Sequence, residues 1–203
     1  VFVHGYNNTF AEAARRTAQI AWDMPFKGIS GFFSWPSRGE TTKYFVDDVI
    51  VDTSITDFED FIEKLVFNTG VEKIHFIAHS MGNRLLTSTL NILLDKESFK
   101  GKLGIIQQIV LAAPDIDQNN FRRLTLPKFS KIGERRTLYT SDQDLALVLS
   151  EKNRGGLVRL GEAGGAIFVD SNLDTVDASN VECPGILNHG YIFETKELLT
   201  DLH

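Results

Sequence analysis

Short apolar segments alternate along this chain with segments of helical periodicity, and this alternation limits the folds open to it. A parallel sheet with helices packed on both faces is the architecture that such a pattern predicts. The apolar segments are short enough for strands and rich in β-branched and aromatic residues: Val1–His4, Ile29–Trp35, Lys73–Ala78, Ile105–Ala113, Arg136–Thr140 and Asn172–Val176. The sequence therefore predicts an α/β fold.

Several of the intervening segments carry helix boundary signals. Thr9 and Glu12 have the spacing of a capping box, and so do Thr56 and Glu59. Pro25 is expected to end the first of these helices and Gly70 the second. In the first helix, five residues are predicted to share one face: Phe10, Ala14, Thr17, Ala18 and Ala21. Three more helices are predicted further along the chain: Asn83–Asp95, Asp144–Ser150 and Glu194–Leu202.

The length of 203 residues suits one domain that spans residues 1–203. The chain begins inside a strand-like segment, without an initiator methionine or a signal peptide. We therefore interpret it as a fragment that lacks the first strands of the sheet and is truncated at its N-terminal side. Any targeting segment would lie upstream, so the sequence indicates no compartment.

Composition excludes several classes of function. A formal net charge of −6 opposes non-specific binding to a phosphate backbone, so we expect no nucleic-acid partner. The apolar runs are too short to span a bilayer. Cys183 is the only cysteine, which excludes an internal disulfide and a cysteine-based zinc site. His75 and His79 lie on a predicted strand rather than on one helix face, so we expect no metal.

The segment Ala78-His79-Ser80-Met81-Gly82 lies between a predicted strand and a predicted helix. This is the context of a nucleophile elbow, a tight turn that needs small residues on both sides of the serine. Ala78 stands where the usual motif has glycine. Amide groups at the start of the following helix can stabilise a developing oxyanion. Ser80 is therefore the predicted nucleophile, with an incidental serine in a small-residue turn as the alternative.

The pair His4-Gly5 ends the first predicted strand, well before the elbow. In α/β hydrolases, a loop at this place contributes one amide of the oxyanion hole, and the residue after the nucleophile contributes the other. The backbone N–H groups of Tyr6 and Met81 are thus the predicted donors.

Chain order predicts the base. In this fold the triad runs serine, acid, histidine. Only His189 and His203 follow Ser80, and His203 is the terminal residue. His189 lies in a predicted loop before the closing helix, so it is the predicted base.

Three aspartates remain candidates for the acid. Asp144 and its neighbour Asp142 follow the strand Arg136–Thr140, and Asp115 follows the preceding strand. We favour Asp144, whose alternative role is to cap the next helix. An orienting acid should place a carboxylate oxygen within about 3.2 Å of His189 Nδ1. If Asp115 made this contact instead, Asp115 rather than Asp144 would be the acid.

Six motifs spread over nearly the whole chain match one family: His4-Gly5-Tyr6-Asn7, Phe33-Ser34-Trp35-Pro36-Ser37, Ala78-His79-Ser80-Met81-Gly82-Asn83-Arg84, Ala113-Pro114-Asp115, Asp144-Leu145-Ala146-Leu147 and His189-Gly190-Tyr191. Through them the chain resembles a family of bacterial α/β-hydrolases of unknown function. The resemblance implies the α/β-hydrolase fold from its third strand onward and a triad of Ser80, Asp144 and His189. Members tend to carry additional N-terminal sequence, and the resemblance implies no substrate.

These features predict a serine hydrolase that cleaves a small-molecule or lipid-like acyl ester through an acyl-enzyme, without a cofactor. The short segment after Asp115 leaves little room for a large lid, which favours soluble or accessible substrates. Cleavage of thioesters or amides and acyl transfer are alternatives, because the same triad performs them. A non-catalytic hydrolase fold that serves as a binding module is the alternative from another class. The sequence indicates no oligomeric state.

Overall fold

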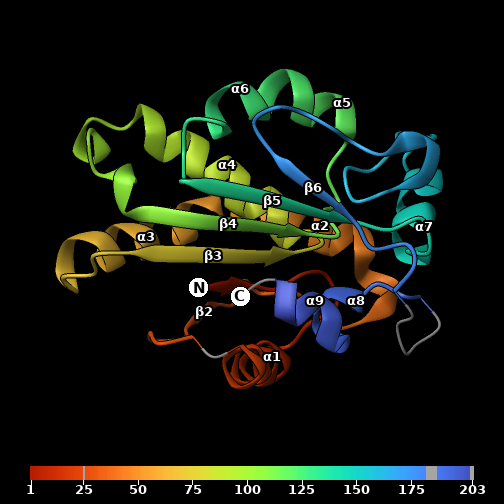
Figure 1. The fold of residues 1–203 in the computed structure, drawn as a ribbon, viewed down its shortest axis with the longest axis horizontal. Helices are drawn as coiled ribbons and strands as arrows, with labels where there is room; N and C mark the ends of the chain where they lie inside the picture. Colours follow the sequence, from red (N-terminus) through yellow and green to blue (C-terminus); the bar gives the residue numbers. More distant parts are fainter. Residues whose placement is uncertain (25, 182–186, 202–203) are drawn as a thin grey trace.

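A computed structural model describes residues 1–24, 26–181 and 187–201 of the protein. Within these residues six strands form one sheet in the order β2-β1-β3-β4-β5-β6, and every neighbouring pair is parallel. In Figure 1 the arrows of β3 and β4 point to the right, so their carboxyl ends face α7. The strands are β1 (Phe2–Val3), β2 (Phe32–Phe33), β3 (Ile74–His79), β4 (Ile106–Ala112), β5 (Arg135–Thr140) and β6 (Asp174–Asp177).

Helices cover both faces of this sheet. They are α1 (Phe10–Asp23), α2 (Tyr44–Thr53), α3 (Ile55–Asn68), α4 (Gly82–Asp95), α5 (Gln118–Asn120), α6 (Leu126–Phe129), α7 (Leu145–Asn153), α8 (Tyr191–Glu194) and α9 (Lys196–Asp201). Successive side chains of a strand point to opposite faces. Accordingly, Leu111 of β4 packs with the residues of α3, α4 and α6, whereas its neighbour Val110 packs with those of α1, α8 and α9. The predicted fold class, a mostly parallel sheet between helices, is confirmed.

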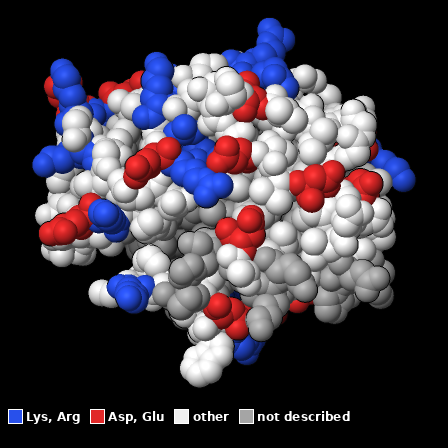
Figure 2. Space-filling model, in the orientation of Figure 1, with Lys and Arg blue, Asp and Glu red and all other residues white. Residues whose placement is uncertain are grey.

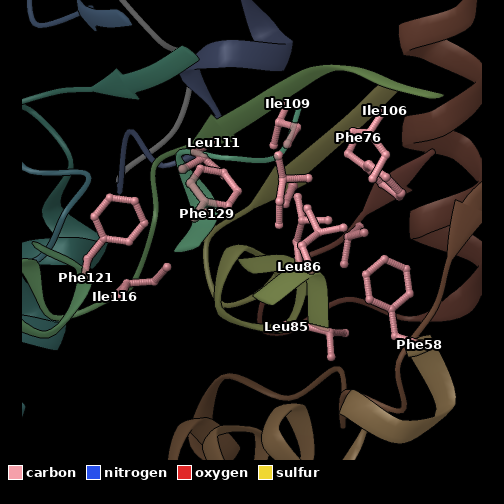
Figure 3. Packing of buried hydrophobic residues seen from close by; sticks show 14 of the residues in the cluster. Phe58, Phe76, Leu85, Leu86, Ile106, Ile109, Leu111, Ile116, Phe121 and Phe129 are labelled. Carbon is pink, nitrogen blue, oxygen red and sulfur yellow. The ribbon is translucent and has the colours of Figure 1, made fainter. Parts of the chain in front are cut away.

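The larger of the two cores lies between the sheet and α3, α4 and α6. Figure 3 shows Phe76 and Ile109 of the sheet against Leu86 of α4, with Phe58 and Phe129 at either side. All five side chains are fully buried. Complete burial of one such side chain contributes about 1.5–3 kcal/mol, so this layer holds the strands that carry the site.

Helix α1 begins where the sequence predicts. Thr9 Oγ1 accepts the N–H of Glu12 at 3.3 Å, and Glu12 Oε2 accepts the N–H of Thr9 at 2.7 Å, which completes the capping box. The predicted face is wrong in part, because Phe10 is 68% exposed, with its ring against that of Phe32 on the edge strand β2. The buried residues are instead Ala13, Thr17 and Ile20. Pro25 lies outside the described residues.

The second predicted capping box is wrong. Thr56 lies inside α3, which begins at Ile55 directly after α2, with Ser54 at the junction. Helix α2 itself was not predicted, because Phe45 and Val49 are 63% exposed and leave no clear apolar stripe. The end of α3 agrees with the prediction, since it stops at Asn68, just before a left-handed glycine (φ +69°) at position 70.

The remaining differences concern connections and strand ends. Strand β2 is shorter than predicted, and Ile29 is 96% exposed. The connection after β4 forms α5, a π-helical turn over Phe121–Thr125 and α6. The closing helix is α9, which the single turn of α8 precedes. None of the helices in the described part of the chain has both the length and the apolar character needed to span a bilayer.

Candidate active site

The carboxyl ends of parallel strands meet at one edge of the sheet, and the predicted site residues lie at this edge. Ser80 follows β3, Asp115 follows β4 and Asp144 follows β5. Tyr6 lies on the loop after β1, and His189 lies on the loop before α8. In Figure 1 this edge is on the right, where α7 and α8 are labelled.

Ser80 forms a strained turn between β3 and α4. Its φ of +52° is left-handed, which costs a non-glycine residue about 1–3 kcal/mol. Three donors converge on its carbonyl oxygen and hold this turn: the backbone N–H of Asn83 at 3.1 Å, Asn83 Nδ2 at 3.1 Å and the backbone N–H of Asp115 at 3.3 Å. Ser80 is only 5% exposed, so the turn that carries it is buried.

Glycines let the loop after β1 lie directly against the elbow. A Cβ at Gly5 would lie 2.7 Å from Ser80 Cβ, and one at Gly82 would lie 2.4 Å from the carbonyl oxygen of His4. Real Cβ atoms do not approach other atoms so closely, so both positions require glycine. This contact places the loop that continues into Tyr6, the residue after Gly5, against the segment that carries Ser80 and Gly82.

The predicted oxyanion donors lie on the two sides of that contact. Arg84 N–H bonds to the carbonyl of Met81 at 3.0 Å, so the amide of Met81 precedes the first helical donors of α4. His4 anchors the other side. Its ring stacks on Trp35, its Nδ1 donates to the carbonyl of Gly5 at 2.8 Å, and its Nε2 lies 3.2 Å from Ser34 Oγ. The amides of Met81 and Tyr6 are thus carried by two anchored segments.

The contact that we expected of an orienting acid is present between Asp144 and His189. His189 Nδ1 donates to Asp144 Oδ2 at 2.7 Å, and Asp144 Oδ1 accepts the N–H of Leu147 at 3.1 Å. One buried carboxylate therefore both holds the imidazole and caps α7. Burial lowers the pKa of His189, but the charge and hydrogen bond of Asp144 outweigh burial, so its pKa is raised.

No hydrogen bond joins Ser80 and His189, both of which belong to the described residues. In free enzymes, the bond between nucleophile and base is often formed only when substrate binds. The two residues are nonetheless linked through His79, whose ring centroid is 4.6 Å from that of His189. From the sequence, His79 had only its place in the elbow motif, and a metal site with His75 was not expected.

The other two acid candidates have different partners. Asp115 binds Arg159 Nε at 2.7 Å, the hydroxyl of Tyr44 at 2.6 Å and Ser150 Oγ at 2.7 Å. Burial raises the pKa of Asp115, but these partners, led by the charge of Arg159, hold it below its usual value. Asp142 is exposed; its carboxylate accepts a hydrogen bond from Gln143 Nε2, and its backbone N–H donates to Ser179 Oγ. Neither aspartate forms a hydrogen bond with His189.

Other features of the molecule are separate from this edge. A mainly apolar cavity of about 960 Å³ lies at the amino ends of the strands, between Ile20 of α1, Phe2 of β1 and Ile77 of β3, and Ser80 does not line it. Among the described residues, no group of three His, Cys, Asp or Glu side chains could hold a metal ion. On the face shown in Figure 2, basic and acidic side chains are interspersed.

Comparison with a protein-family model identifies the family. The model matches residues 1–203, and it is described as an alpha/beta hydrolase of unknown function (DUF900). The chain belongs to this family. The resemblance inferred from the six sequence motifs is thereby confirmed. Membership of this family indicates that the protein is a hydrolase.

None of the curated proteins compared with this alpha/beta hydrolase matches it. Among solved structures, it is similar to a predicted CIB-like hydrolase from Thermoplasma acidophilum, with a TM-score of 0.45 and 16% sequence identity. That similarity covers 99% of this chain and 81% of the other.

Proposed function

We propose that this alpha/beta hydrolase is a serine hydrolase that cleaves a carboxylic ester through a triad of Ser80, His189 and Asp144. The observation that carries the proposal is the 2.7 Å bond from His189 Nδ1 to the fully buried Asp144, at the edge where Ser80 forms the elbow. A carboxylate only accepts, so this bond places the proton of a neutral imidazole on Nδ1 and leaves Nε2 free to act as a base.

In the proposed reaction, Ser80 Oγ attacks the acyl carbonyl while His189 Nε2 takes its proton. The backbone N–H groups of Tyr6 and Met81 stabilise the resulting oxyanion. His189 then returns the proton to the leaving alcohol, and the acyl group remains on Ser80. Water, activated by His189, attacks the acyl-enzyme, which releases the carboxylic acid and restores the serine. No cofactor is required for either half of the reaction.

An activity-directed probe tests the nucleophile. A fluorophosphonate should label the wild-type protein, and Ser80→Ala should abolish the label and lower ester turnover by about 10⁴-fold or more. His189→Ala should fall within about tenfold of the serine variant, because members of a triad act as a unit. Persistent labelling of Ser80→Ala would refute the assignment. No labelling of the wild type would favour the non-catalytic binding module.

The substrate class needs a second measurement. A panel of acyl esters, matched thioesters and matched amides should show the highest kcat/KM on esters. Preference for a thioester or an amide, or for transfer to an added alcohol over hydrolysis, would keep the triad and replace the ester assignment.

A further inference from the structure

His79 lies between the proposed base and α8. Its ring centroid is 4.6 Å from that of His189 and 5.5 Å from that of Phe193. His79 Nε2 lies 2.8 Å from the carbonyl oxygen of His189. Because a carbonyl oxygen only accepts, Nε2 carries a proton and donates it to this bond. The residue that precedes the nucleophile in the chain is therefore bonded to the main chain of the base.

The loop of His189 is held at several points: the carbonyl of Leu187 accepts the N–H of Leu145 at 3.0 Å, and two more contacts involve His189 itself. Asp144 binds the imidazole at Nδ1, and His79 binds the backbone at the carbonyl oxygen. The preceding residue, Asn188, has a left-handed φ of +49°, and α8 begins two residues after His189. Among the contacts of the described residues, the bond from His79 ties the main chain of His189 itself to the end of β3, the strand that leads into Ser80.

We propose that His79 is a positioning residue that fixes the main chain of the base relative to the nucleophile, an inference that rests on the proposed function. One peptide bond separates His79 from Ser80, so the anchor of the base and the nucleophile share the rigid end of β3. A misplacement of about 1 Å between reacting groups can cost on the order of 100-fold in rate. The contact therefore acts on turnover rather than on substrate binding.

The environment of His79 keeps it in the form that this role needs. Burial lowers its pKa well below the usual value, and the neighbouring His189 lowers it further. His79 thus stays neutral when His189 becomes an imidazolium during the reaction. A second positive charge beside the base would oppose proton transfer from Ser80.

Three variants separate positioning from structure. His79→Phe keeps a ring and loses the donor, whereas His79→Gln keeps an N–H group that can reach the same carbonyl. His75→Phe is the matched control, because it makes the same change on the same strand, where the ring contacts only Phe26 at 5.6 Å among aromatic rings of the described residues. His79→Phe should lose about 10- to 100-fold in kcat with KM changed less than about threefold. His79→Gln should recover kcat to within about fivefold of wild type, and His75→Phe should keep it.

A folded His79→Phe with kcat within about twofold of wild type would overturn the proposal, as would equal losses in the Phe and Gln variants. If His79→Phe does not fold, His79→Met replaces it under the same criteria. Proton NMR gives a readout that does not depend on turnover. The Nδ1 proton of His189, bound to Asp144, should exchange with water faster in His79→Phe than in wild type and His79→Gln. Unchanged exchange would refute the anchoring, whereas a wild type without ester turnover would refute only the proposed function.

Discussion

Asp115 and Asp144 follow the neighbouring strands β4 and β5, and both side chains are buried in the described structure. Their partners differ in kind. Asp115 is surrounded by an arginine, a tyrosine and a serine, which belong to three separate segments of the chain. Asp144 is bonded to one backbone amide and to the imidazole of His189. One carboxylate thus joins structural segments, and the other faces a group that can exchange a proton.

The difference shows that burial of an acid at the functional edge of a sheet does not by itself indicate catalysis. The chemistry of its partner indicates which role such an acid is suited to. An arginine stays charged and makes a fixed pair, so Asp115 is suited to hold Tyr44 of α2 and Ser150 of α7 beside the elbow. An imidazole titrates near neutrality, so Asp144 is suited to stabilise the positive charge of His189 when that ring binds a proton. Four experiments test this contrast.

The largest effect should come from Asp144→Asn. An asparagine can still cap α7, but its amide favours the wrong tautomer of the imidazole of His189. The same change in a serine protease triad costs about 10⁴ in kcat, and here we expect a loss of at least about 100-fold with the fold intact. Ester kinetics with circular dichroism as a folding control check this. Near-normal kcat would reduce Asp144 to a helix cap.

Asp115→Asn should act on stability instead. The change leaves Arg159, whose side chain is 3% exposed, without its counter-charge. Breaking a buried pair by removing one partner costs about 3–5 kcal/mol. For a chain of this size, Tm should fall by about 6–20 °C, at about 2–4 °C per kcal/mol. Calorimetry measures the fall, and kcat of the folded variant should drop much less than in Asp144→Asn. A larger kcat loss than in that variant would reverse the two roles.

Tyr44→Phe should also lower Tm, but by less than Asp115→Asn. It removes only the hydroxyl that donates to Asp115 at 2.6 Å. A hydrogen bond to a charged group contributes about 1.5–3 kcal/mol, so Tm should fall less than in Asp115→Asn. A double-mutant cycle of the two changes should show coupling, because both act on one carboxylate. Additive effects would mean that the network does not act as a unit.

The smallest effect should appear in the pH profile. The base must be neutral to accept a proton, so kcat/KM should rise as pH increases through the raised pKa of His189, above 6.5. Asp144 favours the charged imidazole, and its replacement should move this limb to lower pH. Asp115 contributes to the same shift more weakly, so Asp115→Asn should move the limb less. Equal displacements in the two variants would remove the distinction between the carboxylates.

The features that the sequence predicted best are those that depend on residues close together in the chain. Thr9 and Glu12 are three residues apart, and their capping box is visible from spacing alone. The same rule failed at Thr56, because the direct junction with α2 at Ser54 determines where α3 begins. Helix α2 was not predicted, because an apolar residue on its exposed side, Phe45, obscures the apolar periodicity that marks a packed helix. Spacing therefore fails where a tertiary contact decides which residues are covered.

For the site, chain order and motif context were sufficient to select Ser80, His189 and Asp144 as candidates. The bond from His79 to the loop of His189 spans 110 residues, and the pairing of Asp115 with Arg159 spans 44. No periodicity or spacing relates residues so far apart, so these partners emerge only when the sheet brings the segments together. The acid assignment stayed open in the sequence for this reason.

The anchoring of α8 also bears on synthesis of the protein. Gln19 Nε2 in α1 donates to the carbonyl of Phe193 at 2.8 Å across 174 positions, and Arg16 pairs with Glu194 across 178. A nascent chain therefore contains α1 long before it contains α8, and the contact can form only after the 174 positions that separate Gln19 from Phe193 have been synthesised. Until then the face of α1 that packs on α8 is uncovered, and transiently exposed surface of this kind makes a partly folded chain prone to associate with other chains. Because the loop of His189 directly precedes α8, the proposed active site is complete only once both ends of this contact are in place.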